Sequence, residues 1–235
     1  MIPGVRPTVL LFDVDGTLLS AGGAGRRALE RAFAGRCGSA VPLHDVRFNG
    51  MTDPGIVRAG LERLGGTPDE RLIAGILEDY LELLGDELAR ATVFQVYPGV
   101  AALLETLATR REVAVGLGTG NLREGARRKL ERAGLDGHFR FGGFGSDHED
   151  RAELLRIGAG RGATWLGYPP GACRTIVIGD TPHDVAAARA IGADSLGVAT
   201  GGCGVEELRA AGATWAVSDL TAPAALDALC RGETT

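Results

Sequence analysis

The chain has 235 residues, a formal net charge of -5 and a hydrophobic fraction of 45%. A chain of this length buries about 70% of its unfolded surface, enough for one large domain or a domain with a smaller lobe. Its 25 basic residues are scattered and outnumbered by 30 acidic ones, so nucleic acid and acidic membranes are not expected partners. We expect a cytoplasmic protein, since the sequence shows no signal peptide, no long apolar stretch and no CxxC pair.

Short β-rich runs recur along the chain, and helical patterns separate most of them. The expected strands are Thr8–Phe12, Val113–Leu117, Phe139–Phe144, Thr175–Ile178 and Ser195–Ala199. Between strands, apolar residues recur at helical spacing, as at Val100, Leu103, Leu104 and Leu107. Strands that alternate with helices predict a three-layer α/β fold, in which helices cover both faces of a parallel sheet.

The segment from Ser20 to Gln95 breaks this alternation, because it shows helical patterns and no convincing strand. One long apolar stripe runs from Leu72 to Leu84 at helical spacing. We therefore expect residues 20–95 to form an all-helical cap domain inserted into an α/β core domain made of residues 1–19 and 96–235. Glycine-rich residues from Ser20 onward would give one of the two connections the freedom of a hinge.

Two expected strands end in aspartates. The stretch LFDVDGT places Asp13 and Asp15 after the first strand, and IVIGDTPHD places Asp180 at a strand end and Asp184 one turn into a helix. Because parallel strands end at one edge of a sheet, these carboxylates would gather there and repel each other unless a cation neutralises them. Carboxylate oxygens favour a hard divalent ion, so the sequence predicts Mg²⁺ at this edge.

A third strand, in VAVGLGTGN, ends at Thr119, Gly120 and Asn121 just before a helix. Backbone N–H groups and a hydroxyl at a helix N-terminus form a site of the right size for a phosphate group. We also expect Asn121 and Glu124 to pair as a helix cap.

These motifs resemble those of the haloacid dehalogenase superfamily of phosphohydrolases. DVDGT matches its first motif, GTGN its second and GDTPHD its fourth, in the family's order and over essentially the whole chain. Within the family the chain is most similar to the phosphoglycolate phosphatase group. The resemblance implies a Rossmann-like core with an inserted helical cap, and hydrolysis of a small phosphorylated metabolite by a monomer or homodimer. Phosphoglycolate is one candidate substrate, and sugar phosphates and nucleoside monophosphates stay open.

The resemblance also implies roles for the four aspartates. Asp13 would attack phosphorus and form an aspartyl-phosphate, and Asp15 would protonate the leaving alcohol and then activate water. Mg²⁺ would contact Asp13, the backbone carbonyl of Asp15, and Asp180, while Asp184 would reach it through water.

Phosphate binding would fall to Thr119 together with the backbone at Gly120 and Asn121. The family's third motif usually supplies a lysine, yet the only lysine of this chain, Lys129, comes about two turns into the helix after Asn121 and looks badly placed. We predict instead that Arg151, in SDHEDRAELL, takes this role, because arginine keeps the charge and can hold oxygens with two N–H groups.

The loop HDVRFNGMTDPGI, from His44 to Ile56, resembles the family's substrate-facing cap loop. We predict that Arg47, Asn49 and Thr52 contact substrate there. The alternative interpretation is a plain turn in which Asp53 and Pro54 begin the next helix.

Two other functions stay open. A phosphosugar mutase of the same family would usually carry a histidine shortly after the first motif, and none lies between Ser20 and Gly25. A non-catalytic phosphate-binding or interaction module is disfavoured because every expected catalytic carboxylate is present, although the missing third-motif lysine argues for it.

Overall fold

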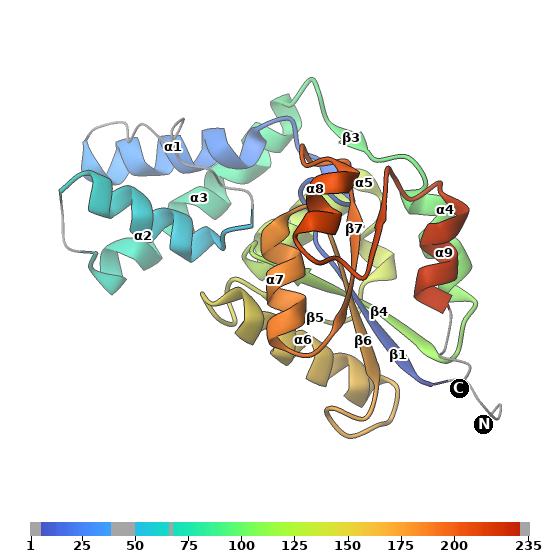
Figure 1. Cartoon of the computed structure of the whole chain (residues 1–235). Coiled ribbons are helices and arrows are strands. Elements are labelled where there is room, and N and C mark those ends of the chain that lie inside the picture. The colour runs from blue at the N-terminus through green and yellow to red at the C-terminus, as the bar shows by residue number, and fades with distance from the viewer. Residues whose placement is uncertain (1–5, 39–49, 66–67, 231–235) are drawn as a thin grey trace.

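The computed structural model describes residues 6–38, 50–65 and 68–230. A central sheet has helices on both faces, and a separate group of helices lies beside it (Figure 1). The sheet order is β5-β4-β1-β6-β7-β8, and all neighbouring strands are parallel. The strands are β1 (Thr8–Phe12), β4 (Val113–Thr119), β5 (Gly142–Phe144), β6 (Arg174–Gly179), β7 (Asp194–Val198) and β8 (Trp215–Val217). The expected α/β fold is confirmed.

All five expected strands are present, with shifted ends in four of them. The run expected from Phe139 is strand only from Gly142, because the chain before it makes a short 3-10 turn, Asp136–His138. Strand β8 was not anticipated, since its three residues are too few to show an alternating pattern.

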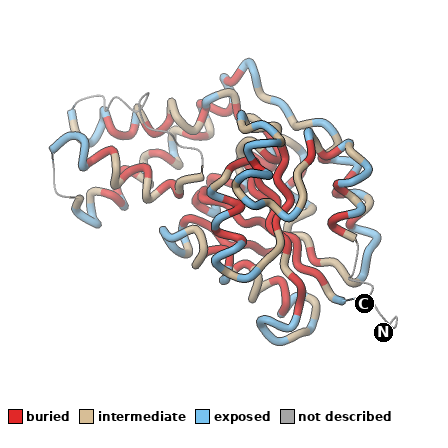
Figure 2. The backbone as a smooth tube through the Cα atoms, in the orientation of Figure 1, coloured by how far each residue is buried: buried red, intermediate tan, exposed pale blue. Residues whose placement is uncertain are grey.

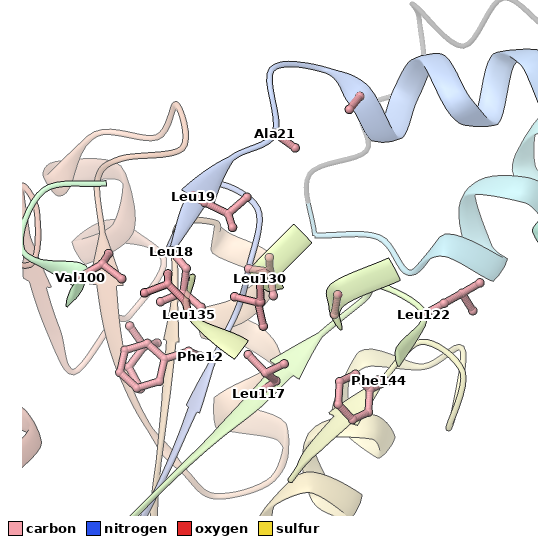
Figure 3. Packing of buried hydrophobic residues seen from close by; sticks show 14 of the residues in the cluster. Phe12, Leu18, Leu19, Ala21, Val100, Leu117, Leu122, Leu130, Leu135 and Phe144 are labelled. Atoms are coloured by element: carbon pink, nitrogen blue, oxygen red, sulfur yellow. The ribbon is translucent and has the colours of Figure 1, made fainter. Parts of the chain in front are cut away.

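Strand β1 is buried on both faces. Leu10 and Phe12 pack into one hydrophobic cluster, while Val9 and Leu11 pack into the other, as the two-residue period of a strand requires. Figure 3 shows Phe12 with Leu117 and Leu130 in the first cluster, and Figure 2 shows buried residues concentrated along the strands. The helices that flank the sheet are α4 (Val100–Ala108), α5 (Arg123–Ala133), α6 (Arg151–Trp165), α7 (Pro182–Ala190), α8 (Val205–Ala210) and α9 (Pro223–Cys230).

Three helices make up the group beside the sheet: α1 (Ala24–Cys37), α2 (Asp53–Arg63) and α3 (Glu70–Arg90). Helix α3 packs against both α1 and α2, and Tyr80 of α3 and Phe33 of α1 are buried in the same hydrophobic cluster. No helix among the described residues is long and apolar enough to cross a membrane.

The chain enters and leaves this helical group through a small ribbon. Strand β2 (Leu19–Ser20) pairs antiparallel with β3 (Gln95–Val96). The expectation of helix only from Ser20 to Gln95 is therefore wrong at its two ends, where two-residue strands are too short to leave a sequence pattern. The ribbon lies where we placed the domain boundaries, and the division into core and cap domains stays a prediction.

Candidate active site

The register of three neighbouring strands brings the motif residues to one edge of the sheet. Phe12 lies beside Leu117 of β4 and Ile178 of β6. Asp13, the residue after Phe12, therefore lies level with the residues that follow Leu117 and Ile178. Thr119 and Asp180 each lie one residue further along the chain. The backbone N–H of Asp13 donates to the Ile178 carbonyl at 2.8 Å, which continues the ladder beyond the strand end.

A glycine lets the chain turn back after Asp13. Gly16 has φ of +90°, a conformation that costs glycine little and other residues much. A Cβ at Gly16 would also lie 2.4 Å from the Asp180 carboxylate. The DxDG motif thus needs its glycine for both the backbone turn and the close approach of the two acidic strand ends.

Three carboxylates form a buried cluster at this edge. Asp13, Asp180 and Asp184 each place one oxygen within 4.8 Å of the others, and all three side chains are buried. Burial raises the pKa of Asp13 to about 6, with Asp184 adding to the rise and Arg151 opposing it. Burial and then the charges of Asp13 and Asp184 raise the pKa of Asp180 to about 8. A cation between these oxygens would relieve the repulsion, and an all-carboxylate donor set suits Mg²⁺.

Arg151 contacts two of the three carboxylates. It is the first residue of α6, after the N-cap Asp150, and its guanidinium lies 3.3 Å from Asp13 Oδ2. Its Nε–H donates to Asp184 Oδ1 at 3.0 Å, and a second N–H contacts the same oxygen. Burial alone would lower the pKa of Arg151, but the two carboxylates raise it above its usual range. The structure thus brings the arginine predicted for the third motif against the aspartate predicted as nucleophile.

Asp184 also has a structural role. Its Oδ2 accepts hydrogen bonds from the Thr181 N–H at 3.1 Å and the Thr181 hydroxyl at 2.6 Å, in the capping box that begins α7. Because Arg151 and Thr181 both hold this carboxylate, its position is fixed. Its contact with a metal through water stays a prediction.

The second motif lies on the other side of Asp13. Thr119 is buried, and a hydrogen bond from its hydroxyl holds the pKa of Asp13 lower than burial alone would. The Asn121 amide donates to Thr119 Oγ1 at 2.9 Å and to Asp15 Oδ2 at 2.8 Å. The expected cap pair of Asn121 and Glu124 is wrong: Asn121 faces the site, Leu122 is the N-cap residue of α5, and Glu124 pairs with arginines of its own helix.

The comparison with known families decides the identification. Residues 7–192 match the family model described as haloacid dehalogenase-like hydrolase. The chain belongs to this family. The expected membership of the haloacid dehalogenase superfamily is therefore confirmed.

Curated relatives of this hydrolase have different names. It is 32% identical to phosphonoacetaldehyde hydrolase of Bordetella avium over 213 residues, which cover 84% of the chain and 73% of the relative. It is 27% identical over 200 residues to tyrosine-protein kinase PtkA of Mycobacterium tuberculosis, covering 85% of the chain. The match spans only 64% of the PtkA length.

Solved structures share the fold of this hydrolase. A hydrolase from Pseudomonas syringae superimposes with a TM-score of 0.73 at 22% identity, covering 96% of this chain and all of the other. CbbY from Rhodobacter sphaeroides, solved with phosphate, gives a TM-score of 0.72 at 20% identity, covering 94% and 99%.

Lys129 is a site residue that the sequence reasoning missed. Its Nζ lies 2.5 Å from Asp15 Oδ2 and 2.6 Å from Asn121 Oδ1. Lys129 contacts Asp15 while Arg151 contacts Asp13, and the assignment of the third-motif role to Arg151 stays a prediction. Lys129 is nevertheless part of the site. A usable signal was that long helical side chains point back toward the helix N-terminus, which here begins at the second motif.

The cap loop contacts the second motif of this hydrolase. The backbone N–H of Asp53 donates to the Gly120 carbonyl at 2.8 Å, and Asp53 Oδ2 accepts from the Leu122 N–H at 2.8 Å. Burial raises the pKa of Asp53 to about 6, opposed by the charge of Lys129. The sequence placed Asp53 in the loop but did not reveal that it caps α5 from a distance.

The three predicted substrate contacts of the cap loop differ in what the structure shows. Arg47 and Asn49 lie outside the described residues. The Thr52 hydroxyl donates to the Glu149 carbonyl at 3.1 Å and accepts from the Gly55 N–H as the N-cap of α2. A contact between Thr52 and substrate therefore stays a prediction, and its observed hydrogen bonds join the loop to the core and to its own helix.

A cavity of about 310 Å³ opens between the helical group and the sheet edge. The catalytic candidates Asp13 and Asp15 lie on its wall, with Lys129 and Arg151 beside them. Tyr80 of α3 lines the same cavity from the opposite part of the molecule. The cavity wall therefore combines charged side chains from the sheet edge with residues from the helical group.

Proposed function

We propose that this protein is a magnesium-dependent phosphatase that hydrolyses a small phosphate monoester through an aspartyl-phosphate on Asp13. One observation carries the proposal: Asp13 lies buried between two further aspartates and the Arg151 guanidinium. This arrangement offers a nucleophile, a place for a divalent cation and a positive charge for phosphoryl oxygens.

The residues of the acidic cluster fit Mg²⁺. Asp13, Asp180 and the backbone carbonyl of Asp15 would hold the ion, with Asp184 contributing through water, and the raised pKa values of Asp13 and Asp180 support a cation at this point. When bound, the ion supplies charge stabilisation for the phosphoryl group.

The chain's own groups account for both halves of the reaction. Asp13 attacks phosphorus, while Thr119, the N–H groups at Gly120 and Asn121, and Arg151 hold the phosphoryl oxygens. Asp15 gives a proton to the leaving oxygen and then takes one from the water that hydrolyses the aspartyl-phosphate. Asp15 is suited to this because its side chain keeps 43% of its exposure at the cavity.

The proposed substrate is a small molecule. A cavity of about 310 Å³ leaves room for a phosphoryl group and a short attached group. Phosphoglycolate is one candidate through resemblance, and the name of the relative phosphonoacetaldehyde hydrolase supports a small phosphorus-containing compound. Predicted contacts from Arg47, Asn49 and Thr52 would select among such substrates.

The test is release of inorganic phosphate from p-nitrophenyl phosphate and a panel of small phosphate esters, with Mg²⁺ or with chelator. We expect Mg²⁺-dependent release that Asp13→Asn abolishes, because an amide is a far poorer nucleophile than a carboxylate. Asp136→Asn, at an exposed carboxylate that does not line the cavity, is the matched control. No release from any compound by folded wild-type protein with Mg²⁺ would exclude a general phosphatase and favour a mutase or a binding module.

A further inference from the structure

Lys129 is the only lysine in a chain with 25 basic residues, and it is buried, with 3% of its surface exposed. An ammonium group loses its hydration when buried, so such a position persists only where partners compensate for the loss. The third-motif role is already proposed for Arg151, and the proposed phosphatase reaction assigns no role to Lys129.

The contacts of Lys129 converge on one oxygen of Asp15. Nζ donates to Asp15 Oδ2 at 2.5 Å, and the Asn121 amide donates to the same oxygen at 2.8 Å. Lys129 also donates to Asn121 Oδ1 at 2.6 Å, which fixes the orientation of that amide, and the amide donates in turn to Thr119 Oγ1. The three side chains thus form a closed triangle of hydrogen bonds around Oδ2.

This triangle restricts how the Asp15 carboxyl group can turn. The terminal torsion of an aspartate is broad and roughly two-fold, so an unrestrained carboxyl group samples many orientations. Two donors on Oδ2 select one of them and leave Oδ1 as the oxygen that can meet a leaving group in the cavity. Helix α1 also packs closely on this group, because a Cβ added at Gly25 would lie 3.7 Å from Lys129 Nζ.

We infer that Lys129 is a positioning residue for Asp15, which it orients for proton transfer to the leaving-group oxygen. This rests on the proposed function. In that step the bond from Asp13 to phosphorus forms as the bond from phosphorus to the ester oxygen breaks. The proton of Asp15 passes to the ester oxygen, so the alcohol leaves neutral and Asp15 remains as a carboxylate.

The experiment compares two substrates of similar size with different needs for that proton. p-Nitrophenolate is stable enough to leave as an anion, whereas phenolate is a poorer leaving group and depends more on protonation. For Lys129→Met we expect kcat on phenyl phosphate to fall by about 100-fold or more, within the usual contribution of general acid catalysis. On p-nitrophenyl phosphate kcat should fall by less than about tenfold, since little protonation is at stake there.

A double-mutant cycle with Asp15→Asn separates positioning from independent action. If Lys129 acts through Asp15, Lys129→Met has little further effect on kcat once Asp15 is replaced. Arg127→Met is the matched control, because Arg127 is on the same helix, half exposed, and pairs with Glu124 and Glu131 at the helix surface. Should Lys129→Met fail to fold, Lys129→Gln, which keeps an N–H donor without the charge, replaces it. Its kcat on phenyl phosphate should also fall more than its kcat on p-nitrophenyl phosphate.

Equal losses on the two substrates, or fully additive losses in the double mutant, would overturn the positioning role. Failure of the proposed function has a different signature: folded wild-type protein with Mg²⁺ would release no phosphate from either ester, or Asp13→Asn would hydrolyse both esters like the wild type. Neither result depends on Lys129, so the two inferences fail in different measurements.

Discussion

The two cationic side chains of the site contact different aspartates. Arg151 meets Asp13 and Asp184, while Lys129 meets Asp15. A guanidinium presents several N–H groups in a rigid plane and can contact two carboxylates at once, whereas an ammonium is a compact point charge. Each cation therefore suits its position, and exchanging arginine and lysine would not be conservative at either one.

At the residue scale, we predict that Arg151→Met lowers kcat by about 100-fold or more, because a preorganised charge at the phosphoryl oxygens is lost. In the metal-free protein the free energy of unfolding should fall by about 3–5 kcal/mol, since Asp13 and Asp184 stay buried without their partner. Steady-state kinetics and urea unfolding measure the two effects. The control is Arg156→Met on the same helix, where Arg156 is largely exposed and pairs with Glu153; this variant should change neither kcat nor the free energy of unfolding. A wild-type kcat in Arg151→Met would show that Arg151 has no catalytic role.

At the scale of elements, the N-terminus of α2 joins the helical group to the core. Asp53 contacts the backbone on both sides of Asn121, and Thr52 contacts the Glu149 carbonyl. Arg58, one turn further along α2, forms an ion pair with the Glu149 side chain at 3.0 Å. These contacts hold the N-terminus of α2 against the second motif, the proposed phosphate-binding turn. A disturbance at this junction should therefore change substrate turnover.

Gly50 gives a test of this junction. It has φ of +79°, and a Cβ there would lie 2.5 Å from the His183 side chain. We predict that Gly50→Ala lowers kcat/KM for p-nitrophenyl phosphate by about tenfold or more, because displacing the loop misplaces groups around the substrate.

The control for Gly50→Ala is Gly134→Ala, at a glycine with φ of +69° and open space around its missing Cβ. Both variants should lose about 1–3 kcal/mol of stability from backbone strain, and only Gly50→Ala should lose activity. Similar kcat/KM values for the two variants would mean that the loop position does not matter for catalysis.

At the scale of the whole molecule, the raised pKa values of buried aspartates couple stability to pH and to metal. Asp13 and Asp53 titrate at about 6 and Asp180 at about 8, against an ordinary value of 3.8. The native state therefore binds more protons than the unfolded state between about pH 3.8 and about pH 8. Their contribution to stability is complete below about pH 3.8 and is lost as the pH rises through 6 and then 8.

We predict that the free energy of unfolding of the metal-free protein falls between pH 5 and pH 8.5, and that Mg²⁺ opposes the fall. An ion bound to the native state alone stabilises it, by about 2.7 kcal/mol at a concentration 100 times its Kd. Denaturant unfolding with Mg²⁺ and with chelator measures both effects. Asp180→Asn should lose most of the Mg²⁺ response, and an equal response in this variant would argue against the acidic cluster as the metal site.

The sequence by itself determined five strands of the main sheet, their parallel arrangement and the residues at their ends, and it missed β8 and the two short strands β2 and β3. Asp13, Thr119 and Asp180 could be placed at one sheet edge because alternation, strand ends and turn glycines are set by a few neighbouring residues. Arg151 followed from a family pattern, and the structure brought it to Asp13.

Only the tertiary structure decided how these groups are oriented and what covers them. Lys129 meets Asp15 across 114 residues and Asp53 meets Leu122 across 69, and no local pattern encodes either contact. The direction of a long side chain along α5 and the position of the cap loop depend on packing between distant segments. Asn121 shows both cases. Its position after a strand could be predicted from the sequence, whereas its hydrogen bond to Asp15 in place of a helix cap depends on packing between distant segments.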